Sequence, residues 1–207
     1  GKSLVTIGLA TALRQKGLSV SCCVIGPNFH QAVTLKGITE RYVHVLDPNL
    51  QSQGQMLESL YMASIGADIV IIEGSGTLLD RLPEGDFVGG VDSYIAKLIF
   101  SPICPIFEVA YNKDESIDIL SKDTKMLKDV HLVSSIANRV SSNQTELLTE
   151  LAIINDSLIA KGLPPLLGVV PEIGNADELA SHGILESRKK QPLSRQFLME
   201  LSKVVAR

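Results

Sequence analysis

The chain has 207 residues, of which 45% are hydrophobic and 20% are charged, a composition typical of one globular domain with a buried core. Its formal charge of −4 argues against a general affinity for nucleic acid or anionic lipid. No apolar run reaches the roughly 18 residues that a membrane span needs. We therefore predict a protein with neither nucleic-acid nor membrane partners.

The three cysteines make neither a disulfide framework nor a spaced zinc site, because Cys22 and Cys23 are adjacent in a strand-like run. The third, Cys104, lies between Ile103 and Pro105 in an apolar setting, where nothing would activate it as a nucleophile. We interpret them as buried free thiols of a cytoplasmic protein.

Short β-branched runs alternate with longer helical patterns, which is typical of βαβ units and a parallel sheet. The predicted strands are 19–25, 42–46, 68–73, 105–110, 131–137 and 166–170. The predicted helices are 3–15, 52–65, 92–100, 115–128, 144–160 and 194–205. The runs at 68–73 and 167–170 are continuously apolar, as expected for strands covered on both faces. Together these elements predict an α/β fold with a mainly parallel central sheet.

Two stretches, 26–41 and 74–90, carry turn residues and are longer than a simple connector. In open α/β sheets the loops at the carboxyl ends of the strands build the site, so these are the candidate functional loops. Within them, His30 and Asp80 would either contact a substrate or remain solvated. Asp47, outside both loops, would either support a magnesium ligand or cap a turn.

The chain opens on Gly1, Lys2 and Ser3, directly before an apolar helical pattern. These residues fit the end of the P-loop pattern G-x-x-x-x-G-K-[ST]. In that loop backbone N–H groups surround phosphates, the Lys neutralises them and the hydroxyl binds magnesium. The positive end of the helix would add to this anion site. Taken alone, the tripeptide also fits a polar helix start.

A P-loop follows a strand in the middle of its sheet, and a sheet cannot omit that strand without leaving unpaired backbone groups in its core. No such strand precedes Gly1 in this sequence. We therefore expect the natural polypeptide to continue upstream. Residues 1–207 are then expected to form a single P-loop NTPase-like domain that lacks its first strand and most of its P-loop here.

The apolar run at 68–73 ends in Glu73, and a glycine-rich turn, Gly74-Ser75-Gly76, follows it. An acid at the end of a buried strand resembles a Walker B position, from which Glu73 would reach a magnesium ion or its water shell, across the sheet from Ser3. The alternative is a solvated acid at a strand end. We favour the functional interpretation because so apolar a strand seldom ends in an acid and small residues by chance.

Six short segments, in order, carry a resemblance to a known family: GKSLVTIGLATAL at 1–13, VIGP at 24–27, LDP at 46–48, EG at 73–74, IANRV at 136–140 and LGVVPE at 167–172. They resemble the first helix, the K-x-G-P loop, the L-D-P segment, the E-G motif, the N-x-V strand end and the L-G-x-x-P turn of one family. It holds dethiobiotin synthetase and the ATP-binding domain of cobyrinic acid a,c-diamide synthase. The resemblance covers most of the chain.

The resemblance implies a three-layer P-loop NTPase fold, ATP and magnesium as cofactors, a small-molecule carboxylate as substrate, and a homodimer. ATP would phosphorylate the carboxylate, and a nitrogen nucleophile would then displace the phosphate. In this scheme Gly1, Lys2 and Ser3 hold the phosphates, Lys2 and Glu73 carry catalysis, and Ser3 and Glu73 position the metal. Most of the catalysis would be positioning and charge neutralisation.

Two later positions are candidates for binding the base of the nucleotide. Asn138 follows the predicted strand at 131–137, where related nucleotide-binding domains use an Asn side chain to read the adenine edge. A turn-forming Asn is the alternative. Pro171 would border the same pocket.

Two departures from the family pattern leave it open whether the chain is an enzyme. Val24 stands where the family carries Lys, and Asn28 stands where it carries Asp. The absence of the family's Lys and Asp weakens the case for carboxylate activation by an ATP-dependent ligase more than it weakens the case for nucleotide binding. Two alternatives remain: an ATPase switch resembling the MinD and ParA group, or a degenerate nucleotide-binding domain with an interaction role.

The homodimer has a second argument from the residues. The two candidate loops contain apolar residues that a monomer would leave partly wet, and such a patch usually marks a contact surface. These residues are Phe29, Val33, Leu35, Leu78, Leu79, Phe87 and Val88. The alternative is that they fold back onto their own domain.

Overall fold

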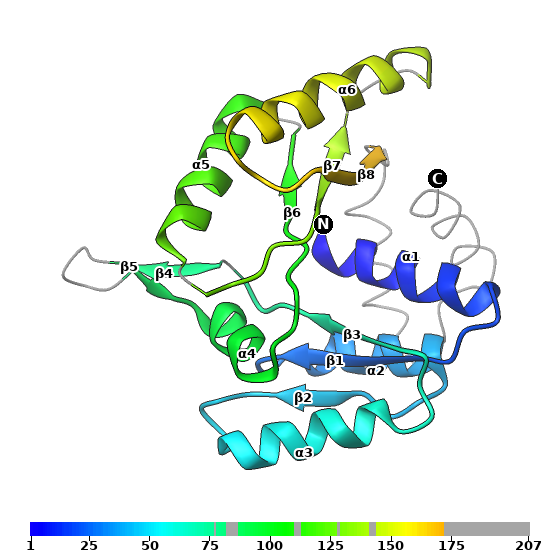
Figure 1. Ribbon diagram of the computed structural model, residues 1–207. Helices are drawn as coiled ribbons and strands as arrows, with labels where there is room; N and C mark the ends of the chain where they lie inside the picture. The colour runs from blue at the N-terminus through cyan, green and yellow to red at the C-terminus, as the bar shows by residue number, and fades with distance from the viewer. Residues whose placement is uncertain (77, 82–86, 110–112, 128, 141–143, 172–207) are drawn as a thin grey trace. The chain divides into compact units, whose positions relative to one another are not determined.

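In the computed structural model the chain divides into two compact units (Figure 1). The structure describes residues 1–171 except 77, 82–86, 110–112, 128 and 141–143. The first unit is described over Lys2–Ser75, and the second over residues 76–171 together with Gly1. The predicted helix at 194–205 lies outside the described residues. Whether the units form the single domain expected over residues 1–207 stays a prediction.

The first unit is a parallel three-stranded sheet with three helices. Its elements in chain order are α1 (Lys2–Gln15), β1 (Val20–Ile25), α2 (Phe29–Thr39), β2 (His44–Leu46), α3 (Gln53–Ser64) and β3 (Ile69–Glu73). The strands lie in the order β2-β1-β3. The connection from β1 to β2 and the connection from β2 to β3 cross the sheet in opposite directions. Because both are right-handed, α2 and α3 lie on opposite faces of the sheet. Helix α1 contacts α2 and both β1 and β3.

The burial of the strands differs from what their composition predicted. Every residue of β1 is buried, because β1 is the middle strand and helices α1, α2 and α3 all contact it. In β3 only Glu73 is buried, and Ile69 is 38% exposed. In the second unit Leu167 is 68% exposed. The two continuously apolar runs are therefore not fully covered, and the prediction was wrong in this respect.

The stretch 26–41, predicted to be a loop, contains the helix α2. Its turn residues act as a helix start: the Asn28 side chain accepts a hydrogen bond from the backbone N–H of Gln31 at 3.4 Å, an N-cap. Gln31, Leu35 and Ile38 are buried along one face of the helix, at the i, i+4, i+7 spacing of an amphipathic helix. Helix α2 ends at Thr39, and its C-cap, Glu40, has φ of 58°.

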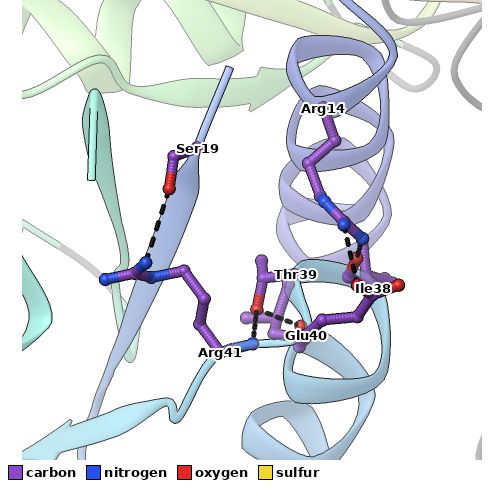
Figure 2. Close-up of polar contacts among 7 residues, drawn as sticks. Arg14, Ser19, Ile38, Thr39, Glu40 and Arg41 are labelled. Carbon is purple, nitrogen blue, oxygen red and sulfur yellow. Dashed lines mark hydrogen bonds and ion pairs between the residues drawn. The ribbon is translucent and has the colours of Figure 1, made fainter. Parts of the chain in front are cut away.

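Two arginines fasten the last turn of α2 to its neighbours, as Figure 2 shows. Arg14 of α1 donates to the Ile38 carbonyl and forms an ion pair with Glu40 at 3.1 Å. Arg41 donates to the Ser19 hydroxyl at 3.4 Å and to backbone carbonyls that follow α3. The final carbonyls of a helix have no partner within the helix, so the Arg14 contact satisfies one of them.

The second unit holds a hairpin and a parallel sheet. Its elements are β4 (Leu79–Arg81), β5 (Phe87–Gly89), α4 (Val91–Ile99), β6 (Ile106–Glu108), α5 (Lys113–Met126), β7 (Ser135–Val140), α6 (Gln144–Ala160) and β8 (Leu166–Pro171). Strands β4 and β5 pair antiparallel, so the stretch 74–90 is not one loop as predicted. Strands β6-β7-β8 are parallel and in sequence order. Right-handed connections then put α5 and α6 on one face, where they lie side by side (Figure 1).

A hydrophobic core fills the space between this sheet and the two helices. Its buried members come from β6, α5, β7 and α6 and from the turn before β8. They are Phe107, Ile117, Leu120, Ala137, Val140, Ile154, Leu158 and Leu163. Burial of such side chains contributes roughly 1.5–3 kcal/mol each, which makes this cluster the main support of the second unit.

All other predicted elements within the described residues are confirmed to within two residues at each end, apart from the strand predicted at 131–137. That strand begins at Ser135 and continues to Val140, while Leu132 makes only an isolated bridge to Ile103. Its register shifts between Asn138 and Val140. Because β7 extends to Val140, Asn138 lies inside the strand, whereas the sequence predicted that it follows the strand. Within the described part of the chain, no helix has the length and hydrophobicity to cross a membrane.

The buried face of α2 predicts a contrast between two of its apolar residues. Leu35 is 0% exposed and Val33 is 60% exposed. Leu35→Ala should lower the free energy of unfolding by about 2–5 kcal/mol, because it leaves a cavity. Val33→Ala should change it by less than about 0.5 kcal/mol. Urea unfolding followed by circular dichroism measures both free energies. Equal effects of the two substitutions would contradict the buried face of α2 and favour the surface loop predicted from the sequence.

Candidate functional site

The site in the first unit is built on one hydrogen bond between the start of α1 and the end of β3. The Ser3 hydroxyl donates to Oε1 of Glu73 at 2.6 Å, across 70 positions of sequence. Glu73 is 4% exposed and Ser3 is half-buried. The structure thus brings together the two residues assigned to the metal, while their roles stay predictions.

The second carboxylate oxygen of Glu73 has a partner that the sequence reasoning missed. Nε2 of Gln31 donates to Oε2 of Glu73 at 2.8 Å. Gln31 is 9% exposed, so this contact is largely shielded from water. The available signal was the buried stripe of α2, which contains two polar residues, Gln31 and Thr39. Thr39 donates to the Leu35 carbonyl within the helix, which leaves Gln31 as the residue whose side-chain partner lies elsewhere. A polar side chain on a buried stripe needs a partner, and here the partner is Glu73.

Lys2 and Gly1 lie at the start of α1. Lys2 is the first residue of the helix and half-buried, and its carbonyl accepts a hydrogen bond from the Thr6 hydroxyl at 3.1 Å. Gly1 precedes the helix and is exposed. A helix N-terminus favours anions, while the phosphate-binding role of both residues stays a prediction.

Magnesium prefers oxygen ligands, keeps several waters, and binds proteins through one or two oxygen side chains together with substrate phosphates. Ser3 and Glu73 offer a hydroxyl and a carboxylate, so the donor set fits this ion. Among the described residues no group of three or more His, Cys, Asp or Glu side chains gathers as a metal site. A magnesium ion here would therefore depend on Ser3, Glu73, water and phosphate oxygens.

Further polar residues surround the carboxyl ends of β1 and β2. Gly26 follows β1 with φ of 73°, and a Cβ built there would meet Cβ of Ser75 at 3.7 Å, so the turns after β1 and β3 are adjacent. Asp47 follows β2, is 4% exposed, and accepts from the Asn49 backbone N–H at 2.9 Å. This bond supports the turn-capping interpretation of Asp47. His30 is exposed.

The two departures from the family pattern each have a structural place in the first unit. Val24 is 1% exposed and lies opposite Glu73 in the register of β1 and β3. Asn28 is the N-cap of α2. A Lys at position 24 would therefore lie opposite Glu73, and an Asp at position 28 would lie at the start of α2.

The residues predicted to border the base belong to the second unit. Asn138 is 5% exposed in β7, between Glu108 of β6 and Val170 of β8. The next residue, Arg139, has φ of 58° and forms an ion pair with Glu108 at 3.6 Å. Pro171 ends β8. That Asn138 and Pro171 serve the same ligand as Ser3 stays a prediction.

The cysteines have the environment of inert thiols. Burial, then the neighbouring charges of Cys23 and Glu73, raise the pKa of Cys22 to about 12. Burial also raises the pKa of Cys23 to about 12, and it raises the pKa of Cys104. Thiols with raised pKa values stay protonated at neutral pH and are poor nucleophiles. The prediction of buried free thiols is confirmed for Cys22 and Cys23, whereas Cys104 is free but only half-buried.

The sequence is similar to several proteins named cobyrinate a,c-diamide synthase. It is 29% identical to that of Syntrophotalea carbinolica over 208 residues, covering 100% of this chain and 44% of the relative. It is 29% identical to that of Listeria innocua over 178 residues, covering 83% of this chain and 37% of the relative. The chain therefore spans less than half the length of these curated relatives. No protein-family model matches it.

Among solved structures the chain resembles the MinD cell division protein of Aquifex aeolicus, with a TM-score of 0.55 and 12% sequence identity. The match covers 100% of this chain and 92% of that protein. At this identity the likeness concerns the fold alone. The predicted fold class and the predicted resemblance are both confirmed: the chain has a P-loop NTPase fold, and its curated homologues are cobyrinate a,c-diamide synthases.

Proposed function

We propose that this chain binds ATP with magnesium at the Ser3–Glu73 site. The observation that carries the proposal is the 2.6 Å hydrogen bond from the Ser3 hydroxyl to the Glu73 carboxylate. It joins the last residue of a P-loop-like sequence to the acid at the end of a β-strand. The P-loop NTPase fold and the similarity to cobyrinate a,c-diamide synthases support it.

Each side chain has a definite task in this proposal. Lys2 neutralises the β- and γ-phosphates from the start of α1. An ionised carboxylate only accepts hydrogen bonds, so the Ser3 hydroxyl is the donor in its hydrogen bond to Glu73. The lone pairs of the Ser3 oxygen remain available to the metal. Glu73 acts on the ion through Ser3 or through a bound water. Magnesium, when bound, neutralises charge that develops on the transferred phosphoryl group.

We further propose a reaction of the amide-forming class, because the similar proteins are named for a diamide product. ATP would phosphorylate a carboxylate of the substrate, and a nitrogen nucleophile would displace the phosphate. The substrate is a small-molecule carboxylic acid, and cobyrinic acid is the first to test. We expect turnover to be slow, because Val24 and Asn28 replace charged groups of the family. The dethiobiotin type of this reaction stays a prediction.

The principal test of the proposal is Lys2→Ala in the full natural polypeptide. Removal of a charged hydrogen-bonding partner costs roughly 1.5–3 kcal/mol, so the affinity for ATP with magnesium should fall about tenfold or more. Lys36→Ala, the same exchange at an exposed position of α2, should leave it unchanged. Calorimetric titration measures both variants. Equal affinity of Lys2→Ala and the unmodified protein would refute the phosphate assignment.

A second prediction concerns turnover. Asn28→Asp restores the family's charge, and Asp caps a helix as well as Asn does, so the melting temperature should change little. We expect it to raise ATP hydrolysis in the presence of cobyrinic acid and ammonia. Val24→Lys, in contrast, puts a cation at a position that is 1% exposed, and should lower the melting temperature. Rapid synthetase activity of the unmodified protein would contradict the expectation of slow turnover.

The homodimer is proposed on a reduced set of residues. Phe29 and Val33 are each 60% exposed on α2 and remain available for a contact. Leu35 and Leu79 are buried within their own units, and Leu78 packs against the hydrophobic core of the second unit, which removes all three from the argument. The side chains of Phe87 and Val88 lie outside the described residues.

Light scattering at micromolar concentration should give the mass of two chains. Phe29→Ser together with Val33→Ser should shift that mass toward one chain, because the substitutions remove exposed apolar area. A monomer mass for the unmodified protein, both with and without ATP, would eliminate the dimer. ATP binding by such a monomer would leave the nucleotide proposal standing.

A further inference from the structure

We propose that Gln31 is a positioning residue of the magnesium site, which holds the Glu73 carboxylate in the orientation that Ser3 requires. The proposal rests on the proposed function of the Ser3–Glu73 pair and deepens it. Gln31 lies on α2, 42 positions before Glu73 in sequence. Gln31 was not among the predicted site residues, because it belongs neither to the P-loop pattern nor to the acidic end of a strand.

The geometry gives each oxygen of Glu73 its own donor. Oε1 accepts from Ser3 at 2.6 Å, and Oε2 accepts from Gln31 at 2.8 Å. With Ser3 alone, the carboxylate could rotate about its terminal torsion, which is broad and two-fold. The second donor removes this freedom. Oε1 therefore stays directed at Ser3.

The chemistry also fixes which end of the Gln31 amide faces Glu73. The carboxylate has no donor when ionised, so the nearby amide atom is the NH₂ nitrogen and not the oxygen. Hydrogen bonds to a charged acceptor are roughly twice as strong as neutral ones. Both contacts to Glu73 belong to this class, and the low exposure of Glu73 and Gln31, 4% and 9%, limits competition from water.

Gln31 is itself held in place by its helix. Its backbone N–H donates to the Asn28 side chain at 3.4 Å, and its side chain shares the buried face of α2 with Leu35 and Ile38. The first turn of α2 is thereby joined to the metal site through Glu73. Because Gln31 is uncharged, it adds a hydrogen-bond donor to the site without adding a charge.

This arrangement predicts a specific dependence on magnesium. Gln31→Met keeps a side chain of similar length and removes the donor. The magnesium concentration that gives half of the metal-dependent gain in ATP affinity should rise about tenfold, because a hydrogen bond to a charged group is lost. The affinity for ATP in the presence of EDTA should change less than about twofold. Gln53→Met, the same exchange at an exposed position of α3, is the matched control and should change neither.

A double-mutant cycle with Glu73→Ala separates positioning from a purely structural role. If Gln31 acts through Glu73, Gln31→Met should have no further effect on the magnesium requirement in the Glu73→Ala background. Should Gln31→Met fail to fold, as judged by its melting temperature without ligand, Gln31→Asn serves in its place. Its amide is one methylene shorter, and it should raise the magnesium requirement in the same direction.

The outcomes distinguish this inference from the proposed function. An unchanged magnesium requirement in Gln31→Met, in a protein that binds ATP normally, overturns the role of Gln31 alone. A loss of affinity that is equal with magnesium and with EDTA, or that persists in the Glu73→Ala background, makes Gln31 a structural residue and overturns it as well. If the unmodified protein does not bind ATP with magnesium, the proposed function fails and the role of Gln31 fails with it.

Discussion

The buried carboxylate of Glu73 is the constraint on which the first unit depends. A charge removed from water is costly unless hydrogen bonds replace its hydration. At 4% exposure Glu73 has little access to water, so Ser3 and Gln31 must supply the missing donors. Meeting that requirement fixes the start of α1 and the start of α2 against the end of β3. Packing of apolar side chains alone would not specify this alignment.

The parallel order of the strands makes the alignment possible. Strands β1, β2 and β3 run in one direction, so their carboxyl ends share an edge of the sheet. Three residues separate the end of β1 from the start of α2, which brings Gln31 to that edge. Glu73, as the last residue of β3, lies at the same edge. Residues distant in sequence thus meet because the chain returns to the same edge at the end of every parallel strand, a general property of open α/β sheets.

The order and type of most elements could be predicted because their hydrophobic periodicity is local information. Helix α2 was missed because Gly26, Pro27 and Asn28 indicate a loop as readily as a helix start, and the buried stripe behind them contains a glutamine. The strand predicted at 131–137 starts late because Leu132 makes only an isolated bridge to Ile103. It ends late because pairing resumes at Val140, beyond the register shift at Arg139. Ser3 and Glu73 could be found from motifs. Gln31 could not, because its significance depends on a partner that only the folded chain brings near.

The two ends of α2 are held by different means, and this limits how the helix can respond to a ligand. Gln31 ties the first turn to Glu73, and Arg14 ties the last turn to α1 through the Ile38 carbonyl. The helix therefore cannot slide or tilt as a whole without breaking the Gln31–Glu73 or the Arg14–Ile38 hydrogen bond. A ligand that displaces the turn around Asn28 would therefore unwind the first turn of α2 before it could move the helix as a rigid body. Strain introduced at this edge of the sheet would stay local and would not reach the far end of the helix.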